Sequence, residues 1–374
     1  MNHVRLGEIC EFVYGKALPK NTREGGNIPV FGSNGMVGTH SEPLTRSETI
    51  IIGRKGSVGE INFSSDPCWP IDTTYYVDCH ATKQDLRWLY YTMRSLRLPD
   101  LNKATGVPGL NRTDAYQREI LVPPLDEQRR IATILDKADA IRRKREQALA
   151  LADDLLRSAY LYLVGMKHPE FLSWEPFPIE WLAEDKRGSI RSGPFGSALL
   201  HSEFVDEGIA VLGIDNAVKN KFQWAERRFI TREKYEELRR YRVYPNDVII
   251  TIMGTTGRSA VVPADIPEAI TTKHLASITC DFGKVLPEFL SFAVHSDPVV
   301  IDQIRAANKG AIMDGLNLGI IRQIKIRKPP MRQQRLFADL LRKTHVAIQN
   351  MTTTTGDGSD LFASLSQRAF RGEL

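Results

Sequence analysis

The segment Pro123-Pro124-Leu125-Asp126-Glu127-Gln128-Arg129 returns in altered form as Pro329-Pro330-Met331-Arg332-Gln333-Gln334-Arg335, 206 residues further along the chain. The same separation, without a gap, relates Leu110-Asn111 to Leu316-Asn317. Ordered repetition of this kind determines the architecture of a chain. We therefore predict a tandem duplication in which the globular part of each half ends at a Pro-Pro junction.

Earlier in each half the separation is 198 residues instead of 206. The change requires about eight extra residues in the second half, which surface loops accommodate at small entropic cost. The positions related in this way are Gly56 and Gly254, Gly59 and Gly257, and the pairs Thr73-Thr74 and Thr271-Thr272.

Each half begins with a mixed pattern of strands and short helices. Thr49–Ile52 and Thr74–Val77 are rich in β-branched and aromatic residues, which predicts strands, and Asp247–Ile252 is the second copy of the first of them. Leu86–Leu96 and Leu286–Val294 are predicted to be short helices at matching places. The expected fold class is mixed α/β (α+β), with two similar globular domains.

A long helix is predicted from about residue 126 to residue 164. After Pro123-Pro124, apolar side chains recur at alternating spacings of three and four, with only Arg145 out of character. Such a stripe is typical of a helix that packs along a partner helix. Its other members are Ile131, Ile134, Ala138, Ile141, Ala148, Ala152, Leu155, Ala159 and Tyr162.

The second copy of this helix begins with the apolar Phe337 and is then interrupted. Thr352–Gly358 contains β-branched threonines and two glycines, which are poor helix formers. We expect a break there, with Ser359 or Asp360 capping a restart. The central and distal helices are expected to form an antiparallel coiled coil that relates the globules by a pseudo-two-fold axis. The expected domains are residues 1–124 (first globule), 125–168 (central helix), 169–329 (second globule) and 330–374 (distal helix).

The composition is that of a soluble globular protein, with 42% hydrophobic and 25% charged residues. No apolar run is long enough for a membrane helix and the start lacks a signal-peptide core, so we expect a cytoplasmic protein with no membrane association. The four cysteines lack a Cys-x-x-Cys spacing and the histidines lack metal-ligand spacing, so neither a metal nor a cofactor is expected. The net charge of +5 permits a polyanionic partner without requiring one.

The junction motif followed by a long helix closely resembles the specificity subunits of type I restriction-modification systems. The resemblance spans essentially the whole chain. Two features depart from the family pattern: Met331-Arg332 stands where the second junction usually has Leu-x-Glu, and the threonine-glycine tract interrupts the distal helix. Further likenesses are the terminal segment Leu361–Leu374 and the segments Ile28–Gly35, Gly53–Gly59 and Ser192–Ser197.

The resemblance implies two target recognition domains, each reading half of a split, asymmetric site in double-stranded DNA. It implies that the paired helices are a spacer and a docking surface for two methyltransferase (modification) subunits, which a motor-nuclease (restriction) subunit joins for cleavage. It also implies a chain with no catalytic residues of its own. Two recognition domains that are held at a fixed distance and have diverged in sequence would recognise different half-sites at a fixed separation.

Candidate DNA-contacting residues lie in glycine-rich loops and threonine pairs at matching places in the two halves. Small residues let backbone N–H groups approach an anion, and Thr and Lys side chains reach base edges or phosphates. Arg54, Lys55 and Arg258 are better candidates for phosphate than for bases, because most protein–DNA hydrogen bonds only position the complex. The remaining candidates are Gly32, Ser33, Asn34, Ser57, Thr73, Thr74, Gly106, Ser192, Ser197, Thr255, Thr256, Thr271, Thr272, Lys273, His274 and Lys309.

Plainer interpretations remain open for these positions, namely turns that join strands and ordinary strand threonines. Two other function classes also remain open. An enzyme with an unrecognised site is opposed by the lack of an Asp/Asn-Pro-Pro-aromatic motif and of a glycine-rich cofactor loop. A protein-only scaffold built on a coiled coil would show no salt-dependent binding to duplex DNA.

Overall fold

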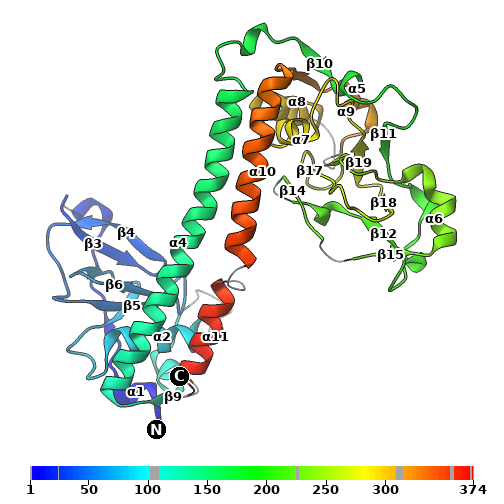
Figure 1. The fold of residues 1–374 in the computed structure, drawn as a ribbon. Coiled ribbons are helices and arrows are strands. Elements are labelled where there is room, and N and C mark those ends of the chain that lie inside the picture. The colour runs from blue at the N-terminus through cyan, green and yellow to red at the C-terminus, as the bar shows by residue number, and fades with distance from the viewer. Residues whose placement is uncertain are drawn as a thin grey trace. The chain divides into compact units, whose positions relative to one another are not determined.

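The computed structural model describes residues 2–23, 25–101, 109–218, 220–224, 227–308, 315–353, 358–370 and 373. The chain forms two compact units, each a mixture of helices and sheets (Figure 1). One unit holds residues 1–148 and 351–374, and the other holds residues 149–350. The division therefore falls inside the long helix and not at its ends.

The first unit contains a four-stranded antiparallel sheet and a three-stranded sheet. The predicted strands Thr49–Ile52 and Thr74–Val77 are confirmed as β5 and β8, which pair with each other. The three-stranded sheet pairs β3 antiparallel with β4 and parallel with β7. The strands are, in sheet order, β2 (Val13–Tyr14), β8 (Thr74–Val77), β5 (Thr49–Gly53) and β6 (Ile61–Ser64), then β4 (Gly35–His40), β3 (Ile28–Gly32) and β7 (Trp69–Pro70).

Helices and a terminal strand pair complete the core of the first unit. The predicted helix at Leu86–Leu96 is confirmed as α2 (Leu86–Ser95), whose Trp88 and Leu89 are buried. Ile131, from the first part of the long helix, lies in the same core. The other elements are α1 (Leu6–Ile9), α3 (Arg112–Tyr116) and the antiparallel strands β1 (Asn2–Arg5) and β9 (Glu119–Val122).

The second unit repeats this plan. Its four-stranded sheet has the order β11-β19-β16-β17, which matches β2-β8-β5-β6, and its three-stranded sheet again contains one parallel pair. The bounds are β10 (Pro176–Pro178), β11 (Ile190–Ser192), β12 (Ile209–Leu212), β15 (Phe229–Ile230), β16 (Val248–Thr251), β17 (Ser259–Val261), β18 (Ala269–Thr271), β19 (Leu275–Ile278), β20 (Lys325–Arg327), α5 (Ile179–Leu182), α6 (Arg232–Leu238), α7 (Pro287–Ser296), α8 (Pro298–Asn308) and α9 (Leu318–Gln323).

Strand register corrects one of the predicted equivalences. Gly53 is paired with Thr74 in the first unit, and Thr251, 198 positions after Gly53, is paired with Leu275 in the second. Thr73-Thr74 therefore corresponds to His274-Leu275 and not to Thr271-Thr272. The prediction aligned the two threonine pairs because their residue types are identical. The register is instead set by backbone hydrogen bonds between strands, and it shows that the second unit has extra residues before β19.

The long helix is confirmed as α4, which runs from Leu125 to Leu163 and contains 39 residues. A buried glutamine attaches its start to the first unit: Gln128 Nε2 donates to Pro123 O at 2.9 Å, and its Oε1 accepts from Asp85 N–H at 2.9 Å. In the second unit Gln334 makes the corresponding bonds to Pro329 and Leu286, at 2.9 Å each. In each unit, the glutamine of the repeated junction thus links the start of the helix that follows the junction to the start of another helix, α2 in the first unit and α7 in the second.

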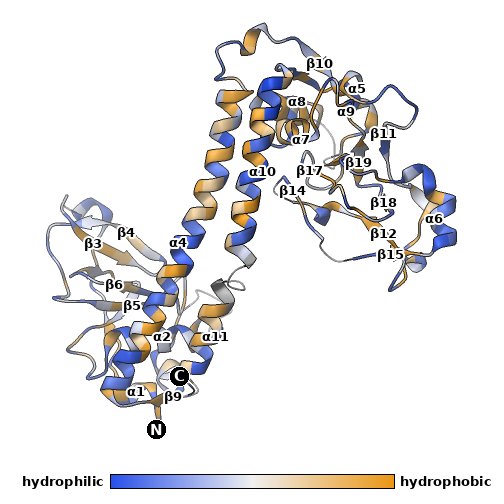
Figure 2. Cartoon of the chain, in the orientation of Figure 1, coloured by the Kyte–Doolittle hydropathy of each residue, from blue (hydrophilic) through white to orange (hydrophobic). Residues whose placement is uncertain are grey.

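The buried face of α4 differs from the predicted stripe. Ile131 and Ala138 are buried, but Ile141 is 56% exposed and Leu155 is 53% exposed, while Leu156 is only 3% exposed. A strict heptad stripe rotates by about 20° per heptad around a helix of 3.6 residues per turn. The predicted positions therefore drift off the buried side along the helix. Figure 2 shows the alternation of hydrophobic and hydrophilic residues along α4.

The distal segment forms two helices, α10 (Met331–Thr353) and α11 (Gly358–Phe370), as predicted. Residues 354–357, within the predicted break, lie outside the described residues. Neither Ser359 nor Asp360 is the N-cap, because α11 already includes both and an N-cap residue has non-helical backbone angles.

Each distal helix packs against a part of α4 within its own unit. In the second unit the ring of Tyr160 lies 5.4 Å from that of Phe337, and Asp153 lies close enough to His345 to affect its pKa, so α4 and α10 run antiparallel there. In the first unit α11 shares a core with the start of α4.

Candidate nucleic-acid interface

In the first unit, loops that are distant in sequence meet at one edge of the sheets. The carbonyl of Thr73 accepts hydrogen bonds from Arg54 N–H at 2.9 Å, Lys55 N–H at 3.1 Å and the Ser33 hydroxyl at 2.6 Å. The carbonyl of Arg54 in turn accepts from Leu110 N–H at 2.9 Å. The loops after β3 and β5, before β8 and before α3 therefore form one connected surface, which we call the loop edge.

The turn after β5 depends on glycine. Gly56 and Gly59 have φ angles of +79° and +74°, which side chains of L-residues rarely adopt. A Cβ at Gly53 would lie 2.0 Å from Ser57 O, so the chain can make this approach only without a side chain there. The predicted glycine loop is thus a tight turn, and its backbone holds the neighbouring residues in place.

The second unit has a loop edge with the same backbone frame. Ile252 N–H donates to His274 O at 2.9 Å, and its carbonyl accepts from Leu316 N–H at 2.7 Å. Gly254 and Gly257 have φ angles of +75° and +80°. Each hydrogen bond and each glycine matches one in the first unit, so the repeat extends to the geometry of the candidate site.

Cationic and aromatic side chains gather at one part of the first loop edge, where β2 and α3 adjoin it. Lys55 is exposed, and the guanidinium carbon of Arg54 lies 5.3 Å from the centre of the Tyr14 ring. Arg112, from α3, approaches the same ring at 5.5 Å. Tyr14 is 54% exposed, so this cluster of one ring and two arginines faces solvent. Such a surface suits a ligand that carries both phosphates and stacked bases.

Different side chains occupy the same frame in the second unit. The position of Arg54 is taken by Ile252, which is buried, and that of Lys55 by Met253. Exposed Lys273 and half-buried His274 are among the polar groups here. Burial, with the charges of Lys273 and Arg228, lowers the pKa of His274, so its imidazole is neutral near neutral pH and carries one donor and one acceptor.

Some predicted site residues cannot contact a ligand in this structure. Thr74 and Thr271 are fully buried strand residues, and Ser192 is also buried. The Thr74 hydroxyl donates to Ile71 O at 2.7 Å, which is a structural role. We therefore remove these three from the candidate set. Gly106 and Lys309 lie outside the described residues.

The remaining candidates divide into two groups. Ser33 is buried and Gly32 ends a strand, so both support the frame. The candidates that are exposed or half-buried are Asn34, Arg54, Lys55, Ser57, Thr73, Ser197, Thr255, Thr256, Arg258, Thr272, Lys273 and His274.

Sequence reasoning missed Tyr14 and Arg112. Tyr14 ends β2, just before Gly15, and a Cβ at Gly15 would lie 2.1 Å from Ile71 O. A large aromatic residue followed by a glycine at a strand end was the available signal. Arg112 follows Asn111, whose side chain accepts from Thr113 N–H at 2.8 Å and caps α3.

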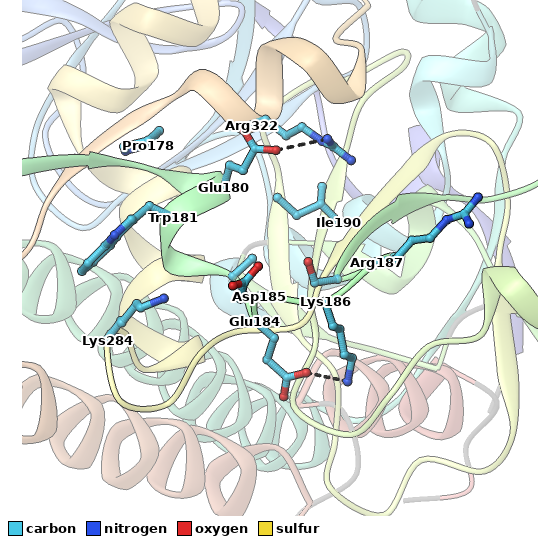
Figure 3. A pocket seen from close by; sticks show the side chains of 13 residues that line it. Pro178, Glu180, Trp181, Glu184, Asp185, Lys186, Arg187, Ile190, Lys284 and Arg322 are labelled. Carbon is cyan, nitrogen blue, oxygen red and sulfur yellow. Dashed lines mark hydrogen bonds and ion pairs between the residues drawn. The ribbon is translucent and has the colours of Figure 1, made fainter.

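A cavity of about 620 Å³ lies elsewhere on the second unit (Figure 3). Ile190, at the start of β11, lines it, whereas the loop edge follows the end of that strand. Glu180 pairs with Arg322 at 3.2 Å and Glu184 with Lys186 at 2.5 Å, so much of its charge is neutralised internally. Across the described ranges, no three His, Cys, Asp or Glu side chains group as metal ligands would. Nor does any helix in those ranges have the length and apolar character to cross a membrane.

Comparisons with known proteins relate the chain to one class. Residues 1–151 match the family model described as type I restriction modification DNA specificity domain. The chain is 21% identical to the type I restriction enzyme EcoBI specificity subunit of Escherichia coli over 352 residues, covering 87% of this chain and 74% of that protein. It is 22% identical to the MjaVIII specificity subunit of Methanocaldococcus jannaschii, with coverage of 91% and 84%.

Solved structures share the fold. The crystal structure of the type I restriction-modification system S subunit from M. genitalium matches with a TM-score of 0.70 at 16% identity, covering 99% of this chain and 96% of that one. A chain from a structural study of complex assembly and conformational transition of the type I system matches with a TM-score of 0.50, also at 16% identity. At these identities the likeness extends to the fold alone.

Proposed function

We propose that the chain is a specificity subunit of a type I restriction-modification system and that each of its two units reads one half of a bipartite DNA site. In this proposal the loop edges face the duplex. The chain contributes recognition and assembly, and catalysis belongs to its partner subunits. The globules at residues 1–124 and 169–329 are the readers, and the helical segments 125–168 and 330–374 are the spacer.

One observation carries the proposal: the two loop edges share a backbone frame but differ in side chains. Arg54 and Lys55 in one unit stand where Ile252 and Met253 stand in the other. A duplicated frame gives two readers of the same geometry, and divergent side chains give them different base preferences. This arrangement supports an asymmetric, split target.

The long helices are the proposed docking surface for two methyltransferase subunits. Apolar side chains on α4 remain exposed, among them Ile141, Leu151, Leu155 and Tyr162. Exposed apolar residues that recur along a helix are a common basis for association with a partner. A motor-nuclease subunit would join the complex that these helices organise.

A hybrid chain tests the proposal. Residues 1–122 are replaced by the first globule of another specificity subunit, and the hybrid is produced with its methyltransferase. Sequencing of methylated sites should show a new first half-site, with the second half-site and the separation unchanged. A change in both halves would contradict the two-reader arrangement.

DNA binding of the unaltered complex provides the complementary measurement. Affinity for duplex DNA should fall linearly with salt on logarithmic scales, because phosphate contacts release counterions. A complex that assembles with the methyltransferase but shows no salt-dependent binding to duplex DNA would favour the protein-only scaffold.

A further inference from the structure

Arg54 is held on its backbone and on its side chain at the loop edge of the first unit. Its N–H donates to Thr73 O and its carbonyl accepts from Leu110 N–H, both at 2.9 Å. Its guanidinium donates from Nε and Nη2 to the carbonyl oxygen of Asp72, at 3.2 and 2.6 Å. Few of the torsions of this long side chain remain free.

Two tyrosine rings lie beside the guanidinium group of Arg54. Its central carbon lies 5.3 Å from the Tyr14 ring centre and 5.9 Å from that of Tyr75. The rings pack edge to face with centres 5.0 Å apart, and the Tyr75 hydroxyl donates to Leu110 O at 3.4 Å. An arginine ordered before binding loses little further entropy when a ligand arrives, which favours a contact with strict geometry.

One side of the guanidinium fork remains available. Within the described part of the chain, the hydrogen bonds of Arg54 use Nε and Nη2, so both Nη1 protons and one Nη2 proton are left for a ligand. That side matches two acceptors in one plane, such as O6 and N7 of guanine in the major groove. Phosphate also accepts such a fork, but it is served equally well by the flexible cation of the exposed neighbour Lys55.

We infer that Arg54 reads a guanine in the half-site bound by the first unit, with Tyr14 as its positioning residue. The inference rests on the proposed function and replaces the phosphate role that the sequence suggested for Arg54. It is restricted to one half-site, because the matching residue of the second unit, Ile252, is only 1% exposed and packs in the core.

The test uses the full chain in complex with its methyltransferase subunits. The target of the unaltered complex is first defined by sequencing methylated sites, and each base pair is then varied in binding assays. Arg54→Lys keeps the charge but loses the planar fork. We expect it to lose about ten- to a hundredfold discrimination at one G·C pair of the first half-site, with the second half-site unaffected.

Three matched variants separate base reading from other roles. Tyr14→Ala should weaken discrimination at the same base pair, and Tyr14→Phe, which keeps the ring, should not. Arg94→Lys changes an arginine of α2 that also lies over a tyrosine, Tyr90 at 5.5 Å, and should leave every preference unchanged.

The outcomes distinguish the inference from its premise. If Arg54→Lys weakens binding to all sequences equally or leaves the preference intact, Arg54 is not a base reader, although the proposed function stands. If the unaltered complex prefers no bipartite sequence, the proposed function itself fails. A thermal transition near that of the unaltered chain shows that Arg54→Lys is folded.

Discussion

The hydroxyl of Tyr160, near the end of α4, donates a 2.7 Å hydrogen bond to the carboxylate of Asp297, and both side chains are buried. Asp297 also accepts from Val299 N–H at 2.8 Å, in the first turn of α8. The Tyr160 ring packs against Phe289, Phe292 and Phe337. One residue thus ties the long helix to three other helices of the second unit.

Tyr160→Phe should lower the free energy of unfolding by about 1–3 kcal/mol, because it keeps the ring but removes one partner of a buried carboxylate. Denaturant unfolding of the full chain measures the change. Tyr162→Phe is the control: Tyr162 is 59% exposed, and its variant should differ by less than about 0.5 kcal/mol. Equal losses in the two variants would contradict a specific role for the buried bond.

Gly59→Ala should be much more destabilising than Gly56→Ala. Both glycines have positive φ, so each substitution carries a backbone cost of about 1–2 kcal/mol. A Cβ at Gly56 meets nothing within 4 Å, whereas one at Gly59 would lie 2.4 Å from Pro99 N. The midpoint of thermal unfolding of Gly59→Ala should be well below that of Gly56→Ala. The reverse order would show that the turn is not packed as described.

Leu155→Asp and Leu156→Asp should have opposite consequences although the residues are adjacent. Leu155 is exposed, so its variant should fold normally but co-purify with less methyltransferase. Leu156 lies in the core of the second unit, where an unpaired carboxylate should prevent stable folding. Circular dichroism and co-purification separate the two effects. Undiminished recovery of methyltransferase with Leu155→Asp would place docking elsewhere.

The stability of the second unit should fall as the pH drops below about 6.5. Burial, followed by the charges of Arg157 and Arg258, lowers the pKa of His295, so the folded state binds fewer protons than the unfolded state in this range. Burial of neutral His295 therefore costs no stability above the unfolded-state pKa of about 6.5. The stability decreases as the pH falls below that value toward the pKa of His295 in the folded state. Unfolding followed from pH 8 to pH 5 should show this loss.

His295→Gln should make that pH profile shallower, because it removes one imidazole that gains a proton on unfolding, while His274 and His345, whose pKa values burial also lowers, remain. Exposed His80, in the first unit, provides the matched control as His80→Gln. A profile equally steep in His295→Gln and in the unaltered chain would show that other groups cause the acid sensitivity.

The sequence by itself determined the duplication, the junction motif and the bounds of the long helix. It also determined the strands β5 and β8 and the helices α2 and α7 to within a residue or two. These are local properties: β-branched runs favour strands, and a proline pair followed by periodic apolar residues favours a helix start. The separation of 206 residues was equally reliable, because Asn111 and Asn317 cap matching helices.

The tertiary structure alone decided which residues meet. Residue type suggested Thr271-Thr272 as the partner of Thr73-Thr74, but hydrogen bonds between strands distant in sequence chose His274-Leu275. The heptad pattern predicted that Leu155 lies on the buried side of α4. Because a regular helix has about 3.6 and not 3.5 residues per turn, the buried position is that of Leu156. Tyr14, Arg54 and Arg112 come together from three segments whose proximity depends on long-range packing, and no local pattern in the sequence encodes it.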